Sequence, residues 1–207
     1  MAEHNPNARL EMFSDGVFAI ALTLLIIDIK IPATTEINNT AQMWLALQHI
    51  VPSILAFVLS FAIILITWVN HHNAFKLAKK SSPAFMYANG LLLLSVVFIP
   101  FPTSLIGEYI LTDHAAPAVI IYNMVLILQS LGWVAICTSG LNANMGHSQK
   151  VIDEIRKNRT YAYYSVVGYL VLAGLSVWFP VPVVIITVLL WIVWLVVGIN
   201  IKHHVEE

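Results

Sequence analysis

The sequence predicts an all-α integral membrane protein with six transmembrane helices in each chain. Composition is the first observation behind this prediction: of 207 residues, 59% are hydrophobic and only 10% are charged, against roughly 25% charged in an average soluble domain. This excludes a typical soluble enzyme and a disordered chain. The net charge of −1 offers no overall attraction to nucleic acid. The single cysteine, Cys137, allows neither an internal disulfide nor a cysteine metal cluster.

The spacing of the charged residues is the second observation. Four long stretches contain no Asp, Glu, Lys or Arg: 37–75, 81–107, 114–149 and 160–201. A membrane-spanning helix needs about 20 mostly apolar residues. The fourth stretch is long enough for two helices divided at the turn 178–182, and a further apolar run precedes the first stretch. We therefore predict spans at about 10–31, 48–75, 84–107, 117–141, 160–178 and 182–201, with room for a short helix at 148–157.

The distribution of basic residues is the third observation. With six spans, nine of the ten basic residues fall on one side, namely Arg9, Lys76, Lys79, Lys80, Lys150, Arg156, Lys157, Arg159 and Lys202. Only Lys30 falls on the other side. The positive-inside rule then places both termini in the cytoplasm. With an odd number of spans, the basic residues would be divided between the two sides of the membrane. We treat residues 1–207 as one transmembrane domain.

Polar residues near the inner ends of the first two spans are the candidates for function. Ionisable residues within membrane helices are costly and usually functional. Asp15 lies in the first span, and the second ends with Asn70, His71 and His72. We expect one of those three side chains to donate a hydrogen bond to Asp15. Two structural alternatives stay open: a helix-start carboxylate favoured by the helix dipole, and histidines that only meet interfacial water.

The first span also carries an apolar stripe. Ile20, Leu24 and Ile27 follow i, i+4, i+7 spacing, with Thr23 beside them and Phe13 on the same stripe one heptad earlier. Aliphatic residues at helical spacing commonly pack against lipid or another helix. The stripe by itself therefore leaves its role open.

Two motifs resemble a known family. Arg9-x-x-x-Phe13-Ser14-Asp15 is followed by Gly-Val-Phe-Ala-Ile-Ala-Leu-Thr-Leu-Leu, and the second span ends with Trp68-Val-Asn-His-His. Both are similar to the signature of the transmembrane protein 175 family of endolysosomal potassium channels and their prokaryotic relatives. Helices after the second match only in pattern.

The resemblance implies a specific architecture. Single-repeat prokaryotic members assemble as homotetramers, with four copies of the first helix around a central pore. The resemblance implies that Ile20, Leu24 and Ile27 form the narrow hydrophobic gate and that Thr23 contributes to potassium preference, with potassium in transit near it. It also implies a structural and gating network at the inner end, made of Arg9, Phe13, Ser14, Asp15, Trp68, Asn70, His71 and His72.

We therefore expect a potassium channel of modest selectivity in a prokaryotic plasma membrane, without cofactors and with membrane lipid as its surroundings. A ring of aliphatic side chains offers no oxygen ligands to replace the hydration shell of an ion. The alternative is a proton-coupled secondary transporter that uses Asp15 with His71 or His72. An enzyme is not expected, because neither HExxH nor GxSxG nor a pair of midplane carboxylates is present.

Overall fold

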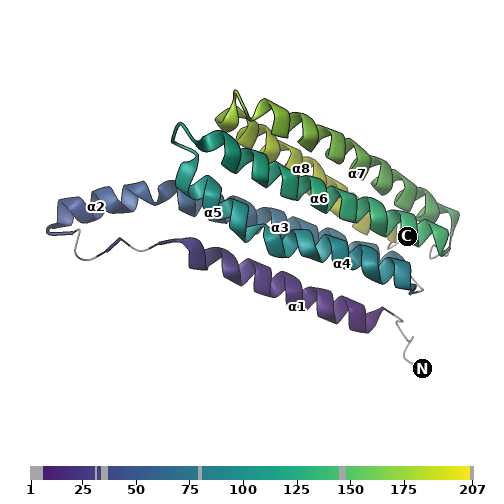
Figure 1. The fold of residues 1–207 in the computed structure, drawn as a ribbon. Coiled ribbons are helices and arrows are strands. Elements are labelled where there is room, and N and C mark those ends of the chain that lie inside the picture. Colours follow the sequence, from purple (N-terminus) through teal and green to yellow (C-terminus); the bar gives the residue numbers. More distant parts are fainter. Residues whose placement is uncertain (1–6, 31, 34–36, 79–80, 145–147, 206–207) are drawn as a thin grey trace.

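Every regular element in the described part of the chain is a helix. The structure is a computed structural model that describes residues 7–30, 32–33, 37–78, 81–144 and 148–205, without the side chains of 28, 77 and 197–205. The elements, in chain order (Figure 1), are α1 (Ala8–Leu24), the 3₁₀ turn η1 (Leu25–Asp28), α2 (Thr40–His49), α3 (Val51–Leu77), α4 (Pro83–Phe98), α5 (Pro100–Tyr109), α6 (Ala115–Asn142), α7 (Gln149–Leu175) and α8 (Pro180–Val205).

Local sequence explains where several of these helices begin. Ser82 and Ser148 precede α4 and α7, and their hydroxyls accept the backbone N–H groups of Phe85 and Val151. Such caps satisfy donors that the first turn of a helix leaves free. Proline, which has no N–H to lose, is favoured in the first turn, and it opens four helices, with Pro52, Pro83, Pro100 and Pro180.

Three predicted spans differ from the structure in their boundaries. The span 48–75 begins inside the short helix α2, and α3 starts separately at Val51. The span 84–107 is divided into α4 and α5 at Ile99, because Pro100 removes a backbone donor and its ring clashes with the preceding turn. The span 160–178 is the second half of α7, which runs without a break from Gln149 and absorbs the short helix expected at 148–157.

Helix α6 is the centre of the arrangement. It packs against α4 and α5 on one side and against α7 and α8 on the other. Helix α1 lies at the edge of the bundle, where it contacts α3 and α4 (Figure 1). Helix α2 projects beyond the end of the bundle and touches little besides α3. Because α1 occupies an edge, part of its surface has no neighbour among the described residues.

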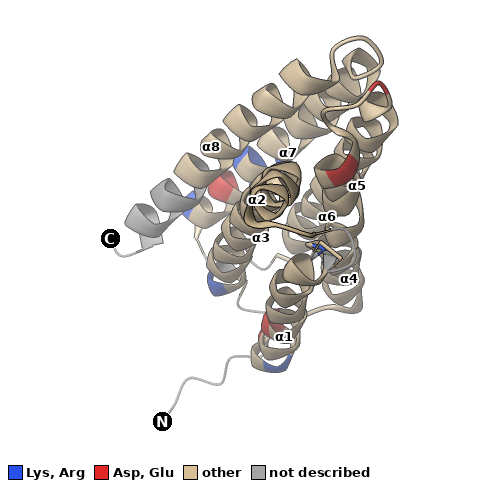
Figure 2. Cartoon of the chain, turned by 90° about the vertical axis from the view of Figure 1, so that its left-hand side faces the viewer, with Lys and Arg blue, Asp and Glu red and all other residues tan. Residues whose placement is uncertain are grey.

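Both termini of the described chain lie toward one end of the bundle, where α1 begins and α8 ends (Figure 1). At the opposite end, Lys30 Nζ lies 3.6 Å from Glu108 Oε2. Charged residues are sparse along the helices between these ends (Figure 2). Of the basic residues that define the predicted topology, Lys79, Lys80 and the side chain of Lys202 lie outside the described part.

Four helical segments in the described part are long and apolar enough to cross a membrane. They are Ala8–Ile27, Val51–Lys76, Pro83–Tyr109 and Ala115–Asn142. The apolar segment Pro180–Val196 of α8 is shorter. Helix α7 is not among the four, and its first turns carry charged residues such as Asp153 and Arg156.

Two glycines permit close approach between helices. A Cβ at Gly132 of α6 would lie 2.8 Å from the Cα of Leu92 in α4, and one at Gly107 of α5 would lie 2.8 Å from the Cα of Ser53 in α3. Small residues at contacts between membrane helices let the backbones pack tightly. This van der Waals packing holds the helices together in lipid, where the hydrophobic effect does not favour their association. The α4–α6 contact therefore depends on the absence of a side chain at position 132.

We expect Gly132→Ala to lower the thermal unfolding temperature of the purified protein. The added methyl group would clash with backbone atoms of Leu92, which cannot move without shifting α4. Overpacking of this kind costs about 1–3 kcal/mol. Gly140→Ala is the matched control, because a Cβ there meets nothing within 4 Å. Equal unfolding temperatures for the two variants would show that the close approach does not limit stability.

Candidate functional site

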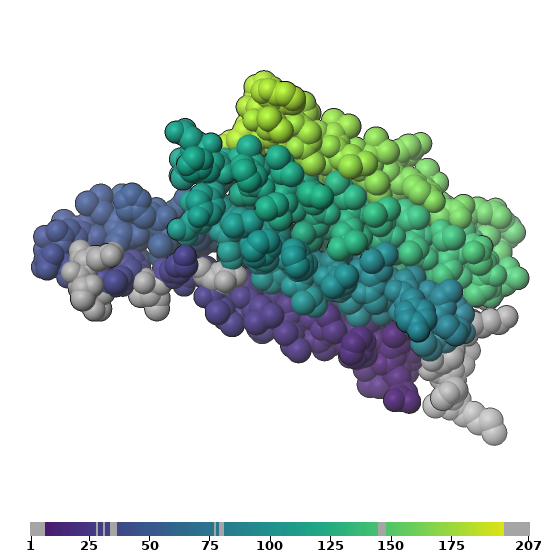
Figure 3. All heavy atoms as spheres, in the orientation of Figure 1, coloured from purple at the N-terminus to yellow at the C-terminus, as the bar shows by residue number. Residues whose placement is uncertain are grey.

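One face of α1 is apolar and uncovered. The exposed fractions are 63% for Phe13, 60% for Ile20, 38% for Leu24 and 70% for Ile27. The opposite face buries Ser14, Phe18, Ala21 and Leu25 against α3 and α4. Figure 3 shows α1 along the margin of the molecule, with its outer side free of other segments. The stripe noted in the sequence therefore points away from the chain's own core.

Thr23 lies on the same uncovered face. Its hydroxyl donates to the backbone carbonyl of Ile20 at 2.8 Å. A threonine hydroxyl has one proton and two acceptor lone pairs. Because the proton is used inside the helix, the oxygen offers acceptor capacity to whatever lies along this face.

The stripe changes helical geometry at its outer end. Leu25–Asp28 form the 3₁₀ turn η1, so Ile27 lies outside the α-helix. A 3₁₀ helix has three residues per turn instead of 3.6. Ile27 is therefore rotated relative to the i+7 position that a continuous α-helix would give it, although its side chain is still exposed.

Asp15 is bonded to a residue that was not expected as its donor. Trp68 Nε1 donates to Asp15 Oδ1 at 2.8 Å, linking α1 to α3. The expectation that Asn70, His71 or His72 fills this role is wrong in its choice of donor, because each of those side chains has a different partner. An indole N–H is an obligatory donor that is normally satisfied when buried, which is the signal that the sequence reasoning overlooked.

His72 bonds to the other acidic residue of the first helix. His72 Nδ1 lies 2.8 Å from Glu11 Oε1. Its ring also stacks on that of Trp68, with centroids 6.1 Å apart and planes inclined by 18°. Glu11 and Asp15 are one helical turn apart, as are Trp68 and His72. The two helices are thus joined by two parallel polar contacts.

His71 belongs to a separate, buried chain of hydrogen bonds. His71 Nε2 lies 2.8 Å from Asn89 Oδ1, Asn89 Nδ2 donates to Ser14 Oγ at 3.0 Å, and Ser14 donates to the carbonyl of Leu10 at 2.8 Å. His71, Asn89 and Ser14 are all essentially buried. Since the Asn89 oxygen is an acceptor, Nε2 of His71 is the nitrogen that donates. His71 also stacks on Phe75, with centroids 4.1 Å apart.

Asn89 was missed by the sequence analysis. It lies in the apolar stretch that precedes Gly90-Leu-Leu-Leu-Leu, and an amide in such a run usually has a buried partner. That partner became visible only when α4 was placed beside α1 and α3.

Three other residues assigned to the network lie apart from it. Asn70 donates to the backbone carbonyl of Trp194 in α8 at 3.3 Å. Arg9 is exposed and makes no ion pair or hydrogen bond with the residues that the structure describes. Phe13, also exposed, lies on the uncovered face. The remaining polar side chains fasten the first turns of α1 to α3 and α4.

Metal binding has no support in this arrangement. No group of three or more His, Cys, Asp or Glu side chains with suitable geometry occurs among the described residues. Glu11 and Asp15 instead accept hydrogen bonds from ring nitrogens. The chemistry of the site is therefore that of a hydrogen-bonded anchor beside a bare apolar helix face.

Sequence relatives cover nearly the whole chain. Residues 9–100 match the family model described as the endosomal/lysosomal potassium channel TMEM175. A protein named as a potassium channel from Chamaesiphon minutus is 38% identical over 185 residues, which is 87% of this chain and 91% of the relative. One from Chryseobacterium is 29% identical and covers 96% and 97% of the two chains.

Solved structures agree with the sequence relatives. The crystal structure of a lysosomal potassium-selective channel TMEM175 homolog from Chamaesiphon minutus superposes with a TM-score of 0.75 at 33% identity, covering 97% of this chain and 98% of the other. The potassium channel MtTMEM175, at 16% identity and a TM-score of 0.64, shares the fold.

Together, the apolar helices and the similarity to potassium channels define a multi-pass membrane protein of the channel class. The chain belongs to the TMEM175 family. This is a family of ion channels rather than enzymes. A relative from Gallus gallus, named an endosomal/lysosomal proton channel, is 30% identical over 68% of this chain but only 29% of its own length.

We expect Asn89→Leu to destabilise the protein, because it leaves His71 and Ser14 without their shared partner. A buried polar group left unpaired costs about 1–3 kcal/mol, which should lower the unfolding temperature in detergent by several degrees. Ser95→Ala is the control on the same helix, since the Ser95 hydroxyl bonds only to its own helix at Leu92. Similar shifts in both variants would argue against a specific link through Asn89.

Proposed function

We propose that the protein is a potassium channel of modest selectivity, formed by a homotetramer with four copies of α1 around a central pore. The single observation that carries this proposal is the uncovered apolar face of α1, with Ile20 and Ile27 exposed on a helix whose other face is fastened to the chain. Support also comes from the family, whose bacterial members named above are potassium channels.

Ile20 is the residue we assign to the narrowest point, with Leu24 and Ile27 forming further apolar layers outward. Four isoleucine side chains meeting at an axis offer no ligand to a potassium ion. Such a ring acts as a hydrophobic constriction that can empty of water and so gate the pore. Conduction is then slow, and the barrier depends on side-chain size and polarity at position 20.

Thr23 is the residue we assign to potassium preference. Its hydroxyl oxygen keeps acceptor capacity on the uncovered face, so four copies would present a ring of oxygens about one turn beyond Ile20. Potassium in transit would meet these oxygens while still largely hydrated. Because no carbonyl cage compensates for dehydration, selectivity over sodium is modest.

The polar anchor has a positioning role in this proposal. The bonds from Trp68 to Asp15 and from His72 to Glu11 fix the rotation of α1 about its own axis. That rotation decides which residues face the pore. Arg9 and Phe13, exposed at the base of the helix, would meet a neighbouring subunit.

We propose six membrane crossings in one domain, residues 1–207, with both termini in the cytoplasm of a prokaryotic cell and the channel in its plasma membrane. Helices α7 and α8 would add the fifth and sixth crossings to the four apolar segments. This topology is supported by the excess of basic residues on one side and by the shared direction of the two termini in Figure 1.

A proton-coupled transporter is the less supported alternative. It would use Asp15 with His71 or His72, yet in the structure Asp15 bonds to Trp68 while the histidines bond to Asn89 and Glu11. These three side chains therefore form no continuous relay. A passive channel needs none.

Replacing the proposed constriction tests the function. Purified protein in liposomes should let potassium pass under a membrane potential alone, without a proton gradient. Ile20→Asn should raise this flux about tenfold, equivalent to lowering the barrier by about 1.4 kcal/mol, because a polar ring stays hydrated. It should also reduce the preference for potassium over sodium.

Leu94→Asn is the matched control, since Leu94 is an exposed aliphatic residue on α4 rather than α1. It should leave both flux and selectivity close to those of the unaltered protein. A potassium flux that does not change in Ile20→Asn would remove Ile20 from the pore. A subunit count other than four in lipid would contradict the assembly.

A further inference from the structure

One face of α7 changes along its length from charged to aromatic to aliphatic. Between positions 153 and 171, the exposed side chains recur three and four residues apart, which is the spacing of a single helix face. In chain order they are Asp153, Arg156, Lys157, Thr160, Tyr163, Tyr164, Val167, Leu170 and Val171. Aliphatic side chains suit the acyl chains of lipid, charged ones suit water, and tyrosines are enriched where the two meet. This order therefore places the inner surface of the membrane near the two tyrosines.

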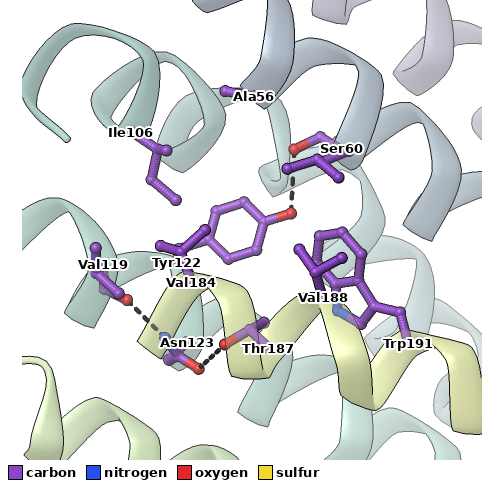
Figure 4. Close-up of a pocket in the computed structure, with 11 residues that line it drawn as sticks. Ala56, Ser60, Ile106, Val119, Tyr122, Asn123, Val184, Thr187, Val188 and Trp191 are labelled. Carbon is purple, nitrogen blue, oxygen red and sulfur yellow. Dashed lines mark hydrogen bonds between the residues drawn. The ribbon is translucent and has the colours of Figure 1, made fainter. Parts of the chain in front are cut away.

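The opposite face of α7 is covered by the chain. Ala162, Tyr169 and Leu172 are buried, and α7 packs against α6 and α8. Those two helices are themselves joined, since Thr187 Oγ1 donates to Asn123 Oδ1 at 3.4 Å (Figure 4). Helix α7 begins at the same end of the bundle as α1 but lies on the other side of it (Figure 1). In the proposed tetramer, the exposed face of α7 would therefore meet lipid and not a neighbouring subunit.

The two basic side chains of this face are available to an anion. Arg156 Nη1 lies 3.2 Å from Asp153 Oδ1. Lys157 Nζ lies 3.9 Å from Glu154 Oε2 and 5.9 Å from the centre of the Tyr161 ring. Exposed ion pairs of this kind contribute little to stability, and the two basic side chains are 60% and 52% exposed. A guanidinium has five N–H donors and an ammonium has three, so both keep donors for a further ligand.

The apolar part of α7 is short, which brings the basic residues close to the membrane surface. From Tyr163 to its end at Leu175, the helix covers about 18 Å at 1.5 Å per residue, against about 30 Å for the hydrocarbon core of a bilayer. A short apolar stretch is accommodated by local thinning of the bilayer and by flanking side chains that reach the interface. Arg156 and Lys157 precede the tyrosines by about 10 Å along the helix, within reach of the lipid headgroups.

We propose that this face of α7 binds an anionic phospholipid of the inner leaflet, with the phosphate group on Arg156 and Lys157. The acyl chains lie along Val167, Leu170 and Val171. The proposal rests on the proposed topology, in which α7 is the fifth crossing and begins in the cytoplasm. Charge complementarity selects the lipid. Phosphatidylglycerol carries a net negative charge, whereas the choline group of phosphatidylcholine cancels the charge of its phosphate.

The test measures lipid binding as thermal stabilisation of the purified protein in detergent. A ligand that binds only the folded protein raises the unfolding temperature as its concentration rises. The protein is titrated with phosphatidylglycerol and, separately, with phosphatidylcholine of the same acyl chains. We expect phosphatidylglycerol to act at the lower concentration. High salt screens charges, so it should weaken the effect of phosphatidylglycerol and leave that of phosphatidylcholine unchanged.

Substitutions on α7 locate the site. Lys157→Gln should raise the phosphatidylglycerol concentration for half-maximal stabilisation about fivefold, and Arg156→Gln/Lys157→Gln about twentyfold, since each basic residue near an anionic surface contributes by a similar factor. Lys76→Gln is the matched control. It removes the same charge from an exposed residue at the same end of the bundle, but on α3. It should change the half-maximal concentration by less than about twofold.

Three outcomes would overturn the proposal. One is equal stabilisation by the two lipids, and another is an unchanged half-maximal concentration in Arg156→Gln/Lys157→Gln. The third is an equal loss in Lys76→Gln, which would mean that the whole basic end attracts the lipid and not α7. If the double variant does not fold, the effect of salt on the unaltered protein decides, and stabilisation by phosphatidylglycerol that salt does not weaken contradicts the site. Stabilisation that depends on Lys157 in a protein without potassium flux would uphold the lipid site and contradict only the proposed pore.

Discussion

The anchoring of α1 by polar side chains is the constraint on which the rest of the structure depends. Inside a membrane, a carboxylate, an amide or an imidazole has little water to bind, so each must find a partner in the protein. Asp15 and Glu11 find theirs on α3, and Ser14 finds Asn89 on α4. Only one rotation of α1 satisfies all three contacts. The same rotation turns Phe13 and Ile20 away from the chain.

This constraint links the stability of the fold to the geometry of the proposed pore, because both depend on the rotation of α1 about its axis. A helix held only by apolar packing in lipid can turn at small cost, since lipid tails are as apolar as leucine. A helix held by directed hydrogen bonds cannot, because turning it would break them. The apolar face of α1 can therefore be bare without being loosely placed, and four such faces can meet with the same side chains at the axis.

Polar groups in this fold serve two different arrangements. Those at the base of α1 bond to protein partners, except that Nδ1 of the buried His71 has none among the described residues. Those on the other face of α3, including Asn70 and Thr67, line small cavities and are satisfied only in part. The first arrangement holds a helix in place, and the second leaves small cavities between helices. Helix α3 carries side chains of both arrangements, with Trp68 and His72 bonded to α1 and with Thr67 and Asn70 facing the cavity.

The sequence by itself determined the helical class, the approximate positions of the long apolar helices and the spacing of the aliphatic stripe on α1, because these depend on composition and on a helical period of 3.6 residues. The tertiary structure decided which side chains form hydrogen bonds with one another. Asp15 bonds to Trp68 and not to a histidine, and His71 reaches Asn89 on a helix that the motifs did not implicate. Hydrogen bonds extend about 3 Å, so they depend on how each helix is rotated and how it crosses its neighbours, and no single segment of sequence carries that information.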